Sequence, residues 1–128
     1  MGEKKKILAV DDDPSILQIV TDKLTVEGFD VIQAPNGQEG LRLAEAEKPD
    51  LILLDLLMPI MGGLEVMKHL RESGEWGKKV PIIVITNVDP DENTVRAVAK
   101  AQPYYFFSKG IFSLEELVVK VKECFSTA

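Results

Sequence analysis

The sequence predicts an α/β fold in three layers: a doubly wound, five-stranded parallel sheet in which every strand is followed by a helix, (βα)5. Two observations support this prediction. Short apolar runs recur along the chain, and most are continuous rather than alternating, as in strands buried on both faces of a parallel sheet. Segments with helical spacing of apolar residues lie between them, which implies right-handed crossovers and helices on both faces. A length of 128 residues suits one domain, residues 1–128.

The first third of the chain contains two strands and one helix. The apolar run Ile7–Val10 predicts the first strand. A helix is expected over Pro14–Glu27, because Asp13 is a favourable N-cap before a proline at the first helical position, and Gly28 ends the pattern. The more alternating run Phe29–Ala34 predicts an edge strand.

The middle of the chain repeats this pattern. Helical spacing is expected over Asn36–Glu47, a buried strand over Leu51–Leu54, and a further helix over Gly63–Glu72. The segment Ser73–Lys79 is interpreted as the longest loop, and its tryptophan, Trp76, as a partly buried anchor.

The last third begins with a strand over Val80–Ile85. An Asp-Pro pair at 89–90 is expected to open a shorter helix, and Tyr104–Phe107 predicts the fifth strand. Ser113 and Glu116 have the spacing of a capping box, so the last helix is expected to begin there.

Charge and composition limit the possible partners. The net charge of −6 disfavours nucleic acid, because binding phosphate backbones requires clustered Lys and Arg. The single cysteine, Cys124, excludes an intramolecular disulfide and fits a reducing compartment. Neither a signal peptide nor a membrane-spanning stretch is recognised, so a cytoplasmic protein with no direct nucleic-acid or membrane partner is expected.

Polar residues whose side chains are able to take part in binding or catalysis follow the predicted strands. They are Asp11 and Asp12 after the first strand, Asp55 after the third, Thr86 at the end of the fourth and Lys109 after the fifth. In open α/β sheets the ligand crevice lies at the carboxyl ends of the strands, so these side chains are expected to meet there. Taken singly, each of these residues has an ordinary explanation as a helix cap, a turn former, a strand residue or a surface cation. Chance explains poorly why all of them fall at the carboxyl edge of the predicted sheet.

The residue types indicate metal-assisted phosphoryl chemistry. Clustered carboxylates raise each other's pKa unless a cation neutralises them, and oxygen ligands without His or Cys favour Mg²⁺. His69 lies in a predicted helix, away from the strand ends. A carboxylate beside Mg²⁺ is able to attack phosphorus and form an acyl phosphate, while a lysine and a threonine hydroxyl hold the remaining phosphoryl oxygens.

In their order and spacing these markers resemble the receiver domain of two-component response regulators, such as the chemotaxis response regulator. The markers are the acidic pair Asp11 and Asp12, Asp55 with Pro59 four residues on, Thr86 and Lys109. The resemblance covers essentially the whole chain. It implies a flavodoxin-like sheet with strand order 2-1-3-4-5, for which the chemotaxis regulator is itself a standard example.

The resemblance also implies individual roles. Asp55 would be the phosphoacceptor, and Asp12 would bind Mg²⁺ directly, together with Asp55 and the backbone carbonyl of Leu57. Asp11 would act mainly through a metal-bound water.

Three further roles concern the phosphorylated state. Lys109 would pair with the phosphoryl group, Thr86 would swing toward it, and Phe106 would take the matching inward rotamer. In this family that coupling remodels the face formed by the fourth helix, fifth strand and fifth helix, as a shift between two populations. The implied partners are a sensor histidine kinase or histidine phosphotransfer protein and a downstream effector protein. The chain would not be an enzyme, and would be a monomer or a weak phosphorylation-dependent dimer.

Several positions depart from the family pattern. Gly110 follows Lys109 where the family usually has a proline after a cis bond, so a trans bond or an altered loop is expected. Asn87 replaces a small residue after the threonine and is expected to narrow access to Asp55. The pairs at 102–103 (Gln-Pro) and 62–63 (Gly-Gly) are expected to alter a turn and a loop.

Two apolar positions predict a long-lived phosphoryl group. In the family, residues two beyond the phosphoacceptor and two beyond the threonine position the hydrolytic water, and here they are Leu57 and Val88. Neither side chain is able to hydrogen-bond water.

Two alternatives remain open. A phosphatase of the haloacid-dehalogenase type also uses an Asp-x-Asp pattern after its first strand, as in Asp11 and Asp13, but it needs a later acidic motif for which Glu115 and Glu116 are poor substitutes. It also leaves Asp55 without a role. The departures at Asn87 and Gly110 allow a second alternative, a receiver-like binding module that functions without phosphorylation.

Overall fold

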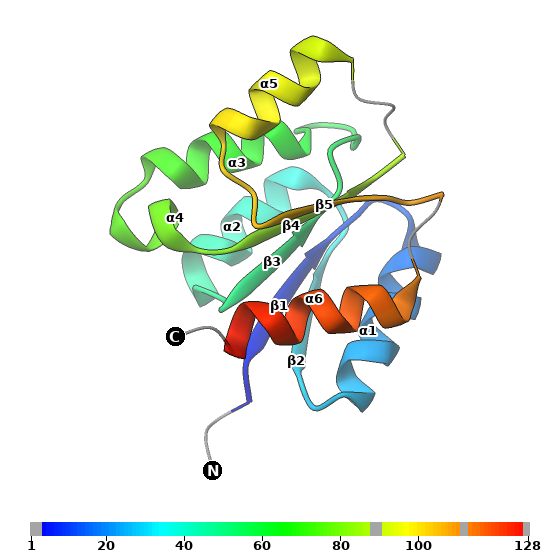
Figure 1. Cartoon of the computed structure of the whole chain (residues 1–128). Coiled ribbons are helices and arrows are strands. Elements are labelled where there is room, and N and C mark those ends of the chain that lie inside the picture. The colour runs from blue at the N-terminus through cyan, green and yellow to red at the C-terminus, as the bar shows by residue number, and fades with distance from the viewer. Residues whose placement is uncertain (1–3, 88–90, 111–112, 127–128) are drawn as a thin grey trace.

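Five parallel strands form one sheet with helices on both of its faces (Figure 1). The computed structural model describes residues 4–87, 91–110 and 113–126. The strands pair in the order β2-β1-β3-β4-β5, which confirms the predicted (βα)5 fold and strand order. In chain order the elements are β1 (Lys6–Val10), α1 (Pro14–Val26), β2 (Asp30–Ala34), α2 (Gly37–Glu47), β3 (Leu51–Leu54), α3 (Gly63–Glu72), α4 (Glu75–Lys79), β4 (Ile82–Thr86), α5 (Glu92–Lys100), β5 (Tyr105–Ser108) and α6 (Leu114–Ser126).

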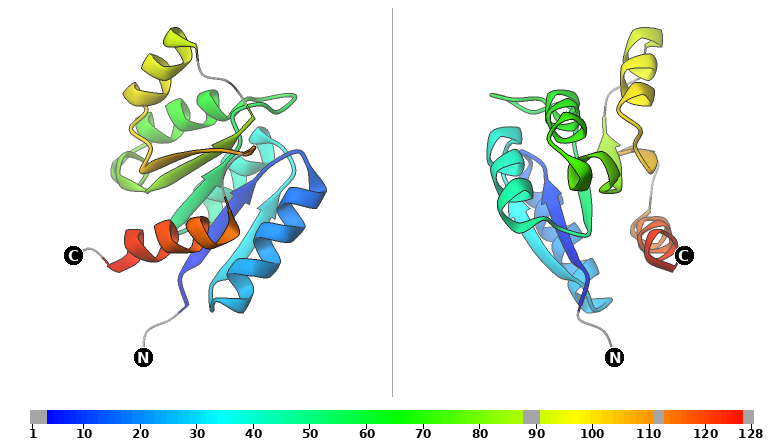
Figure 2. Two further views of the ribbon diagram at one scale, coloured as in Figure 1. Left: turned by 45° about the vertical axis from the view of Figure 1, so that its right-hand side comes forward. Right: turned by 90° about the vertical axis from the view of Figure 1, so that its left-hand side faces the viewer.

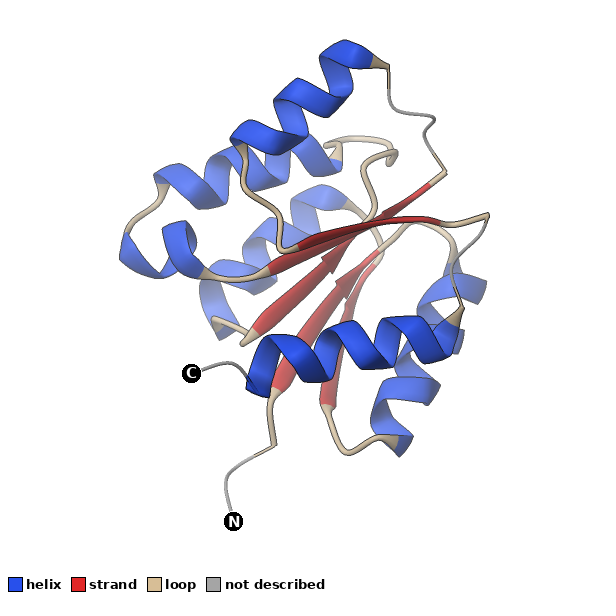
Figure 3. Ribbon diagram, viewed as in Figure 1, coloured by secondary structure: helices blue, strands red, loops and turns tan. Residues whose placement is uncertain are grey.

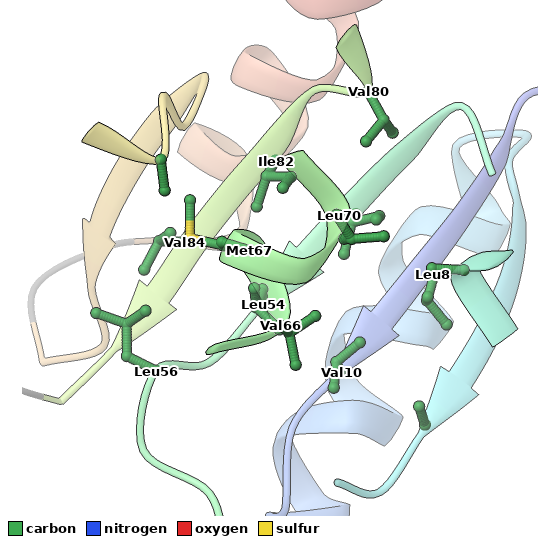
Figure 4. Close-up of a cluster of buried hydrophobic side chains, with 14 of the residues drawn as sticks. Leu8, Val10, Leu54, Leu56, Val66, Met67, Leu70, Val80, Ile82 and Val84 are labelled. Atoms are coloured by element: carbon green, nitrogen blue, oxygen red, sulfur yellow. The ribbon is translucent and has the colours of Figure 1, made fainter. Parts of the chain in front are cut away.

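Two apolar clusters, one on each face of the sheet, form the core. α2, α3 and α5 contribute to the first cluster, and α1 and α6 to the second (Figures 2 and 3). In the first cluster Val66, Met67 and Leu70 of α3 pack over side chains of the central strands (Figure 4). Burying each such side chain contributes roughly 1.5–3 kcal/mol. Within the described part of the chain, no helix is long and apolar enough to cross a membrane.

The position of each strand in the sheet explains its apolar pattern. β1, β3 and β4 have a neighbour on both sides, and residues 7–10, 51–54 and 82–86 are all buried. β2 lies at one edge and exposes Asp30 and Gln33, so the alternating run at Phe29–Ala34 was correctly predicted to form an edge strand. β5 forms the other edge and exposes Tyr105.

Side-chain caps define where two of the helices begin. Asp13 Oδ1 accepts the backbone N–H groups of Ser15 and Ile16, at 2.9 and 3.4 Å. Ser113 Oγ accepts the N–H of Glu116 at 3.1 Å and donates to that residue's Oε1 at 3.2 Å. Both predicted starts are therefore confirmed. Asp13 acts as the cap of α1.

One expectation about the second half of the chain is wrong, and another falls on residues that the structure does not describe. The predicted loop at 73–79 contains the helix α4, which was missed because five residues give too little length for a helical pattern. Trp76 on this helix is partly buried against the first cluster, as expected, and Lys48 Nζ lies 5.4 Å from its ring centroid. The Asp-Pro pair at 89–90 lies outside the described residues, and α5 begins after its N-cap, Asp91.

Candidate functional site

Asp11, Asp12 and Asp55 lie together at the carboxyl edge of the sheet. β1 and β3 are parallel, with Val10 opposite Leu54, so Asp11 and Asp55 follow neighbouring strands at the same level. One carboxylate oxygen from each aspartate lies within 4.8 Å of the other two. Asp11 and Asp55 are only 5% and 4% exposed, whereas Asp12 is exposed to solvent. The cluster therefore has a buried part and an accessible part.

Lys109 closes this cluster from the end of β5. Its Nζ lies 2.8 Å from Asp11 Oδ2 and 3.1 Å from Asp55 Oδ2. Its backbone N–H donates to the carbonyl of Thr86 at 2.9 Å, which joins the ends of β5 and β4. The described residues contain no cis peptide bond, so the bond between Lys109 and Gly110 is trans, as expected, and Lys109 still contacts the cluster. The structure thus brings together the strand-end residues that the sequence singled out.

The electrostatics of the cluster reflect burial opposed by ion pairing. Burial raises the pKa of the Asp11 carboxyl, and the charge of Asp55 adds to this rise. The hydrogen bonds that Asp11 accepts from Lys109 and from the backbone N–H of Asp13, the latter at 2.9 Å, act in the opposite direction. For Lys109, burial lowers the pKa, but hydrogen bonds to the two carboxylates outweigh burial and the pKa is raised. The lysine is therefore held in its charged form.

An open cleft of about 450 Å³ leads to Asp55. Its lining residues are Asp12, Asp13, Pro14, Asp55, Leu57, Asn87 and Lys109. Asn87 is exposed in this lining, where it was expected to narrow the approach. The Leu57 side chain is 60% exposed, and its backbone N–H donates to Asp55 Oδ1 at 3.2 Å. Val88, the second position expected to influence hydrolysis, lies outside the described residues.

Gly63 determines how closely α3 approaches the phosphoacceptor candidate. A Cβ atom at this position would lie 2.1 Å from the backbone carbonyl oxygen of Asp55. The sequence indicated only an altered loop at 62–63. The sequence does contain a glycine at the first helical position, directly after the loop that follows Asp55. Its role in the close approach of α3 could not be predicted, because that role depends on the distance between Gly63 and the Asp55 backbone.

Thr86 and Phe106 lie on the neighbouring strands β4 and β5. Thr86 is fully buried at the end of β4, opposite Ser108. Phe106 on β5 is partly buried against the first apolar cluster. It also lines an apolar groove of about 280 Å³ together with Val95, Val98, Ala99 and Pro103. Their roles as a coupled switch stay predictions.

The donor set fits a hard divalent cation. The ligands that Asp11, Asp12 and Asp55 offer are carboxylate oxygens, and Mg²⁺ binds oxygen ligands of this kind. His69 lies on the exposed surface of α3, with Nε2 3.9 Å from Glu65, and takes no part in the cluster. Asp13, which the phosphatase alternative pairs with Asp11, lines the cleft, but its carboxylate caps α1 and is not one of the three clustered carboxylates.

Comparison with known proteins identifies relatives of this fold and site. The family model described as the response regulator receiver domain matches residues 7–122. The alkaline phosphatase synthesis transcriptional regulatory protein PhoP of Bacillus subtilis is 39% identical over 92% of this chain and 47% of its own length. The response regulator MprA of Mycobacterium leprae is 33% identical over 91% of this chain and 49% of its own. The chain therefore spans about half the length of these curated relatives.

Solved structures agree with these matches. The chemotaxis response regulator CheY4 of Vibrio cholerae superposes with a TM-score of 0.85 at 30% identity, covering 95% of this chain and 99% of that one. The receiver domain of the Francisella response regulator 1452 gives a TM-score of 0.84 at 30% identity, covering 95% and 97% of the two chains.

Proposed function

The chain belongs to the response regulator receiver domain family, and from this membership we propose that Asp55 accepts a phosphoryl group from a phosphohistidine. The donor is a sensor histidine kinase or a histidine phosphotransfer protein. The observation that supports this most directly is the position of Asp55, which is almost buried, contacts Lys109 and opens to a cleft. Such an arrangement suits a nucleophile that must receive one negatively charged group and exclude most water.

The transfer needs one bond to form and one to break. An oxygen of the Asp55 carboxylate attacks phosphorus, the P–N bond of the phosphohistidine breaks, and its electron pair returns to the imidazole. The Leu57 N–H fixes the orientation of the Asp55 carboxylate. Lys109, already charged and within 3.1 Å of Asp55, offsets the negative charge of the incoming phosphoryl group. The Thr86 hydroxyl, which is buried at the end of β4, would swing toward the phosphoryl group and donate to one of its oxygens.

Asp11, Asp12 and Asp55 would hold a Mg²⁺ ion, with the backbone carbonyl of Leu57 as a further ligand and Asp11 acting mainly through water. When bound, the ion neutralises charge on the phosphoryl oxygens. The exposed position of Asp12 gives an ion access from solvent, while burial of the other two carboxylates fixes their positions.

Phosphorylation acts on a partner through the face formed by α5, β5 and α6, which are the fourth large helix, the fifth strand and the last helix of the fold. The half-buried Phe106 side chain lines a groove with residues of α5 and lies on the strand next to Thr86, so it would couple a change at Thr86 to this face. A downstream effector protein in the cytoplasm is the proposed reader. Two well-populated conformations, rather than a new fold, are sufficient for this output.

Intact mass measured after incubation with Mg²⁺ and acetyl phosphate tests the proposal. We expect the wild-type chain to gain one phosphoryl group and the Asp55→Asn variant to gain none. An adduct that persists in Asp55→Asn and maps to Asp11 would favour the phosphatase alternative. Absence of any adduct from the wild type would favour a binding module, for which the exposed Asn87 in the cleft lining is the supporting observation.

A further inference from the structure

A second concave site lies between α3 and α5, which run side by side on one face of the sheet (Figure 1). This α3–α5 groove has a volume of about 490 Å³ and is open to solvent. Its lining residues are Lys68, Arg71, Glu72, Asn93, Arg96, Ala97, Lys100 and Ala101. None of them belongs to the acidic cluster or to its cleft.

Helical spacing explains why these side chains share one groove. On α5 the lining positions 93, 96, 97 and 100 recur at intervals of three and four residues, and on α3 the positions 68, 71 and 72 do the same. Residues at this spacing lie on one face of a helix. The small residues Ala97 and Ala101 lie between the longer ones, which leaves room for a ligand between the two helices.

The groove concentrates positive charge in an acidic chain. Its described lining has four cationic side chains, Lys68, Arg71, Arg96 and Lys100, against one carboxylate, Glu72, whereas the whole chain has a net charge of −6. Within the described residues, Lys68 and Lys100 form no ion pair or hydrogen bond, and both are exposed. Holding the charges of Lys68 and Lys100 beside Arg71 without a counter-ion among the described residues costs free energy that a bound anion would recover.

Arg71 places a fixed cation in this lining. Its Nε donates to the carbonyl of Ala101, its Nη1 to those of Gly77 and Val80, and its Nη2 to that of Gln102, all at 2.7–2.9 Å. These acceptors are neutral, and no carboxylate of the described residues pairs with the guanidinium. A guanidinium has five N–H donors, so one on Nη2 remains without a protein acceptor there.

We propose that the α3–α5 groove binds a compact small-molecule polyanion with two or more phosphoryl groups. Lysine and arginine converging from both walls recognise phosphoryl oxygens, with Lys68 and Lys100 as mobile donors and Arg71 as the fixed one. On α5 the lining positions 93 and 100 are seven residue steps apart, about 10 Å along the helix axis, which matches a short ligand. The inference does not depend on phosphorylation of Asp55.

The dimensions favour a small molecule over an acidic protein segment. A stable protein interface usually buries at least about 1,000 Å², and one groove of this length provides only part of that area. A small anion meets only the groove itself.

Isothermal titration calorimetry with inorganic tripolyphosphate, in EDTA and at constant ionic strength, tests this proposal. EDTA removes divalent ions that would bridge the ligand to the acidic cluster. We expect saturable binding at one site for the wild type and for Asp55→Asn, and an affinity lower by about tenfold or more for the double variant Lys68→Ala/Lys100→Ala. The matched control is Lys78→Ala/Lys79→Ala, which removes two exposed lysines of α4 and should stay within about twofold of the wild type.

Three outcomes would overturn the proposal. They are the absence of saturable binding to the wild type, equal losses in the two double variants, and tighter binding of an oligoglutamate peptide than of tripolyphosphate. The last would assign the groove to an acidic protein segment. Circular dichroism of each variant separates loss of a binding group from loss of the fold.

Discussion

Ile60 combines a strained backbone with an exposed side chain. Its φ is 75°, and the Met61 N–H donates across it to the Pro59 carbonyl at 2.8 Å, as in the rare and strained classic γ-turn. Such a backbone conformation costs roughly 1–3 kcal/mol, and the side chain is 75% exposed. Little packing offsets that strain. We expect Ile60→Asn to raise the free energy of unfolding by about 1 kcal/mol, because asparagine tolerates a positive φ better than a β-branched residue. Urea denaturation followed by circular dichroism measures the change.

Val26→Asn is the matched control for this prediction. Val26 is 81% exposed but lies within α1, where its backbone is right-handed. The same loss of an exposed apolar group should therefore bring no gain in stability. An equal gain at both positions would show that the strain at Ile60 is not the cause.

Leu57 lines the cleft with an exposed side chain while its backbone holds the Asp55 carboxylate. A polar side chain there should position water without disturbing the core. We expect Leu57→Gln/Val88→Gln to shorten the lifetime of phospho-Asp55 on the order of tenfold, less than full general-base catalysis would give. A time course of intact mass, started when acetyl phosphate is removed, measures the rate. Leu57→Met should keep the wild-type rate, and an unchanged rate in the polar variant would contradict the prediction.

At the scale of single residues, the sequence predicted which residues converge better than it predicted their contacts. The convergence of Asp11, Asp55 and Lys109 follows from their positions after parallel strands, because parallel register brings strand ends together. The direct contact between Lys109 and Asp11 was not predicted, since it depends on how a flexible side chain turns. The hydrogen bond from the Leu57 N–H to the Asp55 carboxylate was also missed. Backbone hydrogen bonds in loops have no signature in residue type.

Among the elements, α3 is placed by a contact that only glycine permits. The position of a Cβ at Gly63, 2.1 Å from the Asp55 carbonyl oxygen, means that Gly63→Ala must push α3 away from β3 or distort the loop between them. We expect this variant to lose roughly 1–3 kcal/mol of stability and to be phosphorylated more slowly. Thermal unfolding and the rate of labelling by acetyl phosphate measure the two effects.

Gly62→Ala provides the comparison at the neighbouring position. Its Cβ would lie 3.2 Å from the carbonyl oxygen of Leu56, a tight contact that a shift of a few tenths of an ångström relieves. It should therefore lose much less stability than Gly63→Ala. Similar losses in both variants would indicate a general effect of glycine flexibility rather than the approach of α3 to Asp55.

Strands were easier to predict than short helices, for a physical reason. The central strands β1, β3 and β4 are buried on both faces, so nearly every residue in them must be apolar and the run is unmistakable. α4 has five residues, and its main contribution to the core is Trp76, so no periodic pattern can develop. Its presence depends on packing against α3, where a Cβ at Gly77 would clash with the carbonyl oxygen of Leu70.

Across the whole molecule, charge is distributed unevenly. The chain has an excess of acidic groups, and three of its carboxylates are concentrated at the carboxyl edge of the sheet, with Lys109 as their cation. Lys68, Arg71 and Lys100 lie instead in the α3–α5 groove. Each site is therefore short of counter-charge, so a cation at the first and an anion at the second would both stabilise the folded state.

Because the acidic cluster is short of counter-charge, we expect Mg²⁺ to stabilise the fold. A ligand that binds only the folded state adds about 2.7 kcal/mol at 100 times its dissociation constant. We expect the free energy of unfolding of the wild-type chain to rise with Mg²⁺ toward a gain of this size, and Asp12→Asn to lose most of it because one carboxylate ligand is gone. Thermal unfolding over a Mg²⁺ titration, with ionic strength held constant by NaCl, measures the effect.

Asp13→Asn separates ligand loss from loss of charge. It removes the same negative charge one residue away, and asparagine caps helices about as well as aspartate, so α1 should start as before. Because Asp13 is not among the three clustered carboxylates, its variant should keep the full response to Mg²⁺. If Asp12→Asn and Asp13→Asn lose the response equally, Mg²⁺ acts by screening the acidic surface. A loss confined to Asp12→Asn assigns the ion to the site beside Asp55.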